Sequence, residues 1–108
     1  MNTYVAIRGL SDNLETTVTV NGEYLRLEPS LKLRNHSPTG FEWGYGGSGP
    51  AQLALAILLD SQGPEIALQH YQNFKNAFIA GAKQEGFTIT EKEIGTFIKQ
   101  VTAKTERK

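Results

Sequence analysis

The sequence is dominated by one stretch, residues 35–59, which reads NHSPTGFEWGYGGSGPAQLALAILL. A polar turn and an aromatic segment lead into a glycine-rich loop, and an unbroken apolar run follows. Pro50 stands where the first helical turn favours proline, with Ser48 or Gly49 as the cap. The pattern predicts a helix over residues 51–60. Because this helix is apolar nearly all round, the rest of the chain has to cover it on every side.

Strands are expected before this helix. Residues 4–8 are rich in β-forming side chains and end at a glycine. Residues 16–20 and 23–27 flank Asn21-Gly22, a pair typical of a two-residue type I′ hairpin turn. Such a turn places Val18 opposite Leu25. The inward face would carry Val18, Val20, Leu25 and Leu27, and the outward face Thr17, Thr19, Tyr24 and Arg26.

The remaining segments complete an α+β order. Residues 11–13 predict a turn, residues 31–34 a short strand after Pro29, and residues 41–45 the last strand. A second helix is expected from Pro64 to about residue 84, with Ala67, Tyr71, Phe74, Phe78 and Gly81 on one face. A capping box at Thr90 and Glu93 predicts a third helix.

We therefore expect an α+β fold: a sheet of about four strands, mostly antiparallel, followed by three helices, the first buried on the sheet. Residues 1–102 would form a single domain, and residues 103–108 a frayed C-terminal tail. If one chain does not fully cover the apolar helix, a second copy would, giving a homodimer.

Composition narrows the classes of function. Lysine plus arginine equals aspartate plus glutamate, 11 against 11, so binding to long nucleic acid or to an anionic membrane is not expected. Cysteine is absent, which excludes disulfides and thiolate chemistry. The longest apolar run, residues 53–59, is too short to span a bilayer, and no secretory signal is visible. A cytoplasmic protein is expected.

The run NHSPTGFEWGYGGSGPAQLALAIL resembles the signature of an uncharacterised family of small proteins from bacteria, archaea, phages and plasmids. Residues 67–75 and 86–94 resemble the family as well, and the resemblance is weaker in residues 1–30. It implies a setting in mobile elements, where small proteins often bind or inhibit host factors. It implies no catalytic role, because the function of the family is unknown.

The glycine loop is the main candidate for a binding site. Glycines let a backbone approach a ligand, and a helix N-terminus offers free amides and a partial positive charge to a phosphate. The loop is not a Walker motif, since no lysine and hydroxyl pair follows it. The alternative is a tight strand-to-helix turn whose glycines allow close packing.

Neighbouring residues add to this candidate site. Arg34 would pair with a phosphate, and Trp43 or Tyr45 would stack a base. Alternatively, the aromatic residues are core and His36 is a turn residue. The candidate ligand-binding residues are Arg34, His36, Trp43, Tyr45, Gly46, Gly47, Ser48 and Gly49.

No catalytic residue, metal or cofactor is expected. Ser48, His36 and Glu42 can be written as a triad, but nothing resembles a nucleophile elbow. His36 and His70 lie on different elements without a carboxylate at ligand spacing. Glu42 lies among aromatic residues and needs a partner if buried, which Arg8, Arg26 or Arg34 would supply.

Two hypotheses about function follow. The first is a small non-enzymatic protein that binds or sequesters a phosphate-containing ligand, such as a signalling nucleotide, in a phage, plasmid or host-defence setting. The alternative is a protein-interaction module that inhibits a host enzyme or defence complex, through a face of the sheet or the later helices. The partner would be a small anionic ligand in the first case and a host protein in the second.

Overall fold

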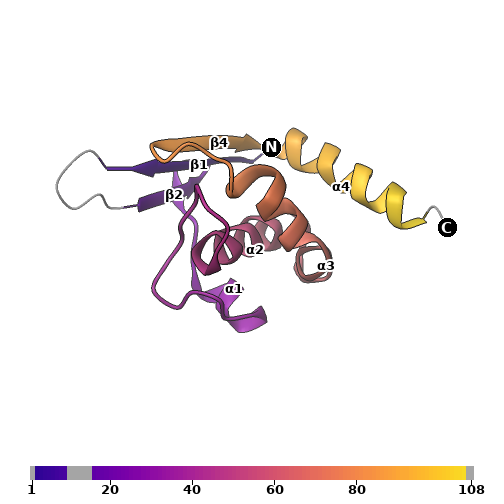
Figure 1. Cartoon of the computed structure of the whole chain (residues 1–108), viewed down its shortest axis with the longest axis horizontal. Coiled ribbons are helices and arrows are strands. Elements are labelled where there is room, and N and C mark those ends of the chain that lie inside the picture. The colour runs from indigo at the N-terminus through magenta and orange to yellow at the C-terminus, as the bar shows by residue number, and fades with distance from the viewer. Residues whose placement is uncertain (1, 10–15, 107–108) are drawn as a thin grey trace.

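The computed structural model describes residues 2–9 and 16–106. Its sheet has the strand order β3-β2-β1-β4, and all neighbouring strands are antiparallel. The strands are β1 (Thr3–Arg8), β2 (Thr16–Val20), β3 (Glu23–Tyr24) and β4 (Gly86–Thr90). Helices α1, α2 and α3 lie on one side of the sheet (Figure 1). The predicted α+β class is confirmed, while the turn predicted at residues 11–13 lies outside the described residues.

The hairpin between β2 and β3 has the predicted register. Val20 pairs with Glu23, and Asn21 and Gly22 both have positive φ, +52° and +86°, as a type I′ turn requires. The second strand is shorter than predicted and ends at Tyr24, although the Leu25 amide still donates to the Val18 carbonyl at 2.9 Å. The strand ends three residues before its predicted end at residue 27.

Two predicted strands are wrong. Residues 31–34 were expected to be extended, but α1 (Glu28–Leu33) occupies most of this segment. Pro29 fixes a helical φ in the first turn, with an acidic residue before it and Lys32 in the last turn, and these local signals outweigh a short alternating pattern. Residues 41–45 form no strand either, because Gly44 turns the chain at φ +87°.

Helix α2 (Ser48–Gln62) is the centre of the molecule, as predicted. Its residues from Gly49 to Leu58 are all buried. The N-cap residue is Gly47, one residue before Ser48 and two before Gly49, the two predicted caps. The sheet covers one side of α2, and α1 and α3 pack against others (Figure 1). One chain therefore covers this segment, and the condition under which a homodimer was expected is not met.

Helix α3 (Pro64–Phe74) continues into a π-helical turn, η1 (Lys75–Ile79), and ends earlier than the predicted residue 84. The wider turn shifts the phase of the buried face. Ile79 is consequently buried, whereas Phe78 is half-buried and Gly81 is exposed. The prediction that Gly81 belongs to the inward face is wrong for this reason.

Strand β4 and helix α4 (Glu91–Glu106) follow. The strand was not predicted, and it supplies the fourth member of the sheet by pairing with β1. Thr90 and Glu93 form the predicted capping box: the Glu93 amide donates to Thr90 Oγ1 at 3.2 Å, and the Thr90 amide donates to Glu93 Oε1 at 3.0 Å. α4 points away from the body and stays helical to Glu106, through most of the segment expected to fray (Figure 1). Residues 107–108 lie outside the described part.

Candidate functional site

Gln52 organises the turn that precedes the glycine loop. Its side chain is completely buried inside the apolar helix α2. Oε1 accepts from the backbone amides of His36 at 2.7 Å and Ser37 at 2.9 Å, while Nε2 donates to the Ser30 hydroxyl at 2.9 Å and the Arg34 carbonyl at 3.1 Å. The amide group thus has both its acceptor and its donors satisfied. One side chain therefore joins α1 and the turn to the central helix.

His36 lies in this turn and contacts α3. Its Nε2 lies 2.7 Å from the Tyr71 hydroxyl on α3, and the two rings are tilted with centroids 5.5 Å apart. The imidazole is therefore bonded to α3 and not to Ser48, and Glu42 is bonded elsewhere. The triad that can be written from the sequence is not assembled.

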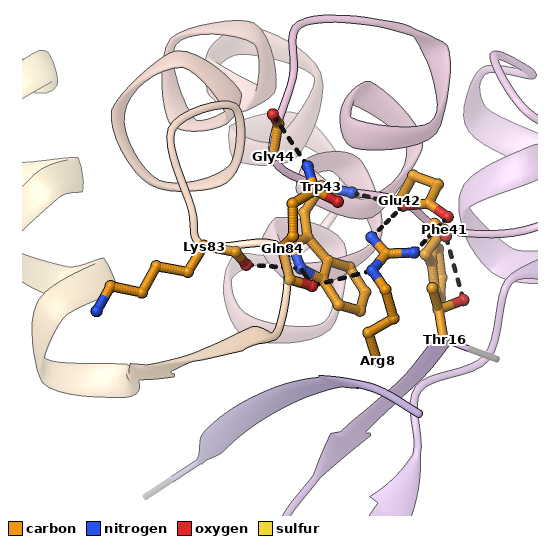
Figure 2. Close-up of polar contacts among 8 residues, drawn as sticks. All are labelled: Arg8, Thr16, Phe41, Glu42, Trp43, Gly44, Lys83 and Gln84. Atoms are coloured by element: carbon orange, nitrogen blue, oxygen red, sulfur yellow. Dashed lines mark hydrogen bonds and ion pairs between the residues drawn. The ribbon is translucent and has the colours of Figure 1, made fainter. Parts of the chain in front are cut away.

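Glu42 pairs with Arg8, one of the three arginines that the sequence offered (Figure 2). Arg8 Nη2 lies 2.6 Å from Oε1 and Nη1 lies 3.1 Å from Oε2, so the pair is bidentate. Hydrogen bonding from Arg8 lowers the pKa of the Glu42 carboxyl below its usual value, against the opposing effect of burial. The same bonds raise the pKa of the Arg8 guanidinium. Both groups stay charged near neutral pH.

Trp43 is part of the core and is 0% exposed. Its Nε1 donates to the backbone carbonyls of Lys83 at 3.0 Å and Gln84 at 3.1 Å (Figure 2). Its ring meets Phe87 edge-on, and the Arg8 guanidinium lies 4.8 Å from its centroid. The proposed role of Trp43 as a platform for a base is therefore wrong, whereas its interpretation as core is confirmed. Tyr45, the other residue predicted to stack a base, is 50% exposed.

The glycine loop is a close-packed turn at the start of α2. A Cβ on Gly49 would lie 2.7 Å from the Glu42 Cβ, and one on Gly47 would lie 2.6 Å from the Tyr45 ring. The Ala51 amide donates to the Gly47 carbonyl at 3.0 Å and so begins the helical pattern. The amides of residues 48 and 49 precede this bond and are the donors of the first turn. Packing accounts for glycine at position 49, where the Glu42 backbone and Cβ leave no room, whereas at position 47 a Cβ would meet only the half-exposed ring of Tyr45.

A pocket of about 350 Å³ lies beside this loop. Three of the eight predicted residues line it, namely Tyr45, Ser48 and Gly49. Arg34, His36, Trp43, Gly46 and Gly47 do not. The wall includes Thr16, Ser37, Thr39, Gly40, Phe41 and Glu42, which sequence reasoning did not assign to a binding site. Hydroxyl groups predominate among the described lining residues, and the one charged residue among them is the paired carboxylate of Glu42, so this described part of the wall offers no cation to a phosphate.

A second surface is the face of the sheet opposite the helices. The burial pattern and register place Thr3, Val5, Ile7, Thr17, Thr19, Tyr24, Gly86, Thr88 and Thr90 on it. Tyr24, Thr19, Val5 and Thr88 form one row across all four strands. None of these outward residues carries a charge, although 20% of the sequence is charged. We call these residues the open sheet face.

Residues 7–100 match the model of a family described as a family of unknown function, DUF6166. The chain belongs to this family. The membership that the sequence signature suggested is therefore confirmed. No curated protein and no solved structure matches the chain.

Two further findings concern this DUF6166 member. Across residues 2–9 and 16–106, no three histidine, aspartate or glutamate side chains come together as a metal site. In the same part of the chain, no helix has the length and apolar character needed to cross a membrane.

Sequence reasoning missed Gln52 and the open sheet face as organised features. A signal for Gln52 was present, since a lone amide in an apolar helix needs buried partners. The alternation of Thr17 and Thr19 with valines predicted the outward face of β2. The rest of the surface could not be predicted because β4, which completes it, was not predicted.

Proposed function

We propose that this protein acts by binding another protein and that the open sheet face is its contact surface. The observation that carries the proposal is the continuous uncharged surface across four strands, with Ile7 55% and Tyr24 78% exposed. Monomeric proteins normally place charged side chains on the solvent side of a sheet, and exposed apolar patches commonly mark binding sites. The partner class we propose is a host enzyme or defence complex, in the mobile-element setting that the family resemblance implies.

The chemistry of the face favours a protein over other partners. A surface for nucleic acid or an anionic membrane carries lysine and arginine, because binding depends on neutralising phosphates. The outward positions of the four strands have none. Threonine, valine and isoleucine instead pack well against another flat apolar surface, such as a sheet or a helix face.

The size of the face predicts a reversible contact. Three strands of about 17 Å and the two-residue β3 of about 7 Å, at about 4.8 Å spacing, give roughly 280 Å² in projection. Stable complexes bury about 800 Å² on each partner. The face alone therefore suits a transient interaction. A shallow hollow of about 410 Å³ around Gly86, between Ile7 and Thr88, offers a place for one projecting side chain of the partner.

Affinity capture from host lysate with three variants tests the proposal. Thr19→Lys and Thr88→Lys each place a positive charge on the face. The side chains at these positions point to solvent, so the fold should tolerate both substitutions. Asn73→Lys adds the same charge on the exposed surface of α3 and serves as the control. We expect a stoichiometric partner that the wild type and Asn73→Lys retain and that both threonine variants lose. Equal capture by all four proteins would refute the role of the face.

A second candidate function is binding of a phosphate-containing ligand, such as a nucleotide, at the pocket beside the glycine loop. The hydroxyl-rich wall and the amides of residues 48 and 49 favour it. The carboxylate of Glu42 in the same wall opposes an anion. Titration calorimetry with mono-, di- and cyclic nucleotides decides the matter. Heat that saturates and is abolished by Ser48→Glu would support a phosphate site, and a flat response across the panel would exclude it.

A further inference from the structure

A separate cavity lies at the opposite end of α2 from the glycine loop. It has a volume of about 350 Å³ and is bounded by the β2–β3 hairpin, α1 and the C-terminal half of α2. Its apolar wall is formed by Val20, Leu25, Pro29, Ala56 and Leu59. This volume falls in the range of pockets that hold small molecules.

The cavity exists because the chain leaves the sheet early. β3 is only two residues long, and α1 begins at Glu28 instead of a continued strand. A strand that continued to residue 27, as the alternating pattern predicted, would have extended the hairpin along α2. The side of α2 that carries Ala56 and Leu59 therefore faces the space between the hairpin and α1.

The charges around this cavity are predominantly negative. Glu23 and Asp60 belong to its wall. The Glu23 carboxylate has no hydrogen bond or ion pair within residues 2–9 and 16–106, and Asp60 Oδ2 accepts only from the Tyr4 hydroxyl, at 2.6 Å. Arg26 is the one cation among the described residues of the wall, and its Nε lies 3.7 Å from Glu28 Oε1, so a nearby carboxylate already offsets its charge.

The helix terminus adds to the negative potential. Asp60 lies in the last turn of α2, where the peptide dipoles present a partial negative charge. That turn contains no basic residue. Glu91 lies close by, bonded to Ser61. The C-terminal end of a helix favours cations, so this end of α2 carries an electrostatic mismatch that a bound cation would relieve.

We propose that this cavity binds a small organic cation, a linear aliphatic chain that ends in primary ammonium groups, as in free diamines and polyamines. The methylene chain lies against Leu25, Ala56 and Leu59, and ammonium groups meet the carboxylates of Asp60 and Glu23. Two carboxylates without a cationic partner match a ligand with two positive charges. The inference does not depend on the function proposed for the open sheet face.

Amide-resolved NMR titration of the full chain with 1,6-diaminohexane tests the inference. We expect saturable shifts confined to amides around Val20, Leu25, Ala56 and Leu59. Hexane-1,6-diol, which has the same length without charge, is the control ligand and should leave these amides unchanged. Shifts that scatter over the surface, or equal shifts with the diol, would overturn the proposal.

Charge-removing variants make the test specific. Asp60→Asn keeps an acceptor for the Tyr4 hydroxyl, and Glu23→Gln changes an exposed side chain, so both should fold. Each should weaken diamine binding about tenfold, as expected for the loss of one charge-assisted hydrogen bond. Glu65→Gln, an exposed acid in the first turn of α3, is the matched control and should bind as the wild type does. Unchanged affinity in both Asp60→Asn and Glu23→Gln would refute the site.

One further arm separates the free ligand from a protein partner. A short peptide with a single lysine presents one ammonium group on an aliphatic stem attached to a bulky backbone. We expect the free diamine to bind more tightly, because it carries two charges and fits inside the cavity. Binding of the peptide alone would overturn the assignment to a free diamine.

Discussion

Replacing Gln52 by leucine tests how the turn before the glycine loop is held in place. The substitution keeps a similar volume in the core and removes four hydrogen bonds. A buried polar group left without a partner costs about 1–3 kcal/mol, whereas a group that water can reach costs less. The Ser30 hydroxyl keeps its own bond to the Leu27 carbonyl at 2.8 Å. The amides of His36 and Ser37 and the carbonyl of Arg34 lose their partner.

These losses set the expected size of the effect. His36 and Ser37 are half-buried, so water can replace part of the hydrogen bonding that the Gln52 side chain provided. Counting about 1–2 kcal/mol for each of the three orphaned backbone groups, we expect Gln52→Leu to lower the free energy of unfolding by about 3–6 kcal/mol. This is a large share of the stability of a small domain, which is about 5–15 kcal/mol.

The assay is urea unfolding followed by circular dichroism, with Gln69→Leu as the matched control. Gln69 is exposed on α3, so its replacement should change stability by no more than about 0.5 kcal/mol. Trypsin adds a local readout, because cleavage after Arg34 should accelerate once the turn detaches from α2. The reasoning would be refuted if Gln52→Leu cost less than about 1 kcal/mol and left cleavage after Arg34 unchanged.

Three further predictions follow from the core and from the ion pair. Leu55→Ala in the fully buried part of α2 should lower the free energy of unfolding by about 2–5 kcal/mol in chemical denaturation; a loss typical of surface changes would show that α2 is not central. Gly86→Ala should be strongly destabilising, because residue 86 has φ +149° and its new Cβ would lie 2.2 Å from a carbonyl oxygen of β1. Gly95→Ala, which has open space in α4, should be neutral or slightly stabilising. Similar melting temperatures for the two variants would contradict this packing. Arg8 lowers the pKa of Glu42, so their pairing stabilises the fold above the unfolded pKa of that carboxyl and is lost as the pH falls through its lower folded value. The stability of Glu42→Gln should therefore fall less steeply on acidification than that of the wild type, and parallel acid curves would count against the pair.

The sequence predicted those parts of the fold that local chemistry determines. The Asn21-Gly22 turn, the apolar helix and the capping box at Thr90 each depend on neighbours within a few residues, and all three are present. Strand β4 was missed because its identity depends on pairing with β1, at the other end of the chain. A short run such as residues 86–90 carries no local signal that separates a strand from the start of a helix.

The candidate site was predicted only in part for a related reason. Tyr45, Ser48 and Gly49 come together because they follow one another along the loop. Trp43 alternates with Tyr45 in the sequence, but Gly44 turns the chain between them. Trp43 therefore enters the core, where its indole N–H donates hydrogen bonds to the carbonyls of residues 83 and 84. No spacing rule within residues 41–45 could indicate those distant partners.

The position of β1 between β2 and β4 has a consequence for how the molecule is made. Residues 3–8 gain their second neighbour only when residues 86–90 have been synthesised. Until then one edge of β1 has no partner, and the inward side of the emerging sheet lacks Phe87 and Ile89. Such long-range pairing slows folding, because loop closure must occur before the contact stabilises the chain. Synthesis of residues 3–90 therefore passes through a stage in which β1 is present with one unpaired edge, and an unpaired strand edge favours aggregation and capture by chaperones.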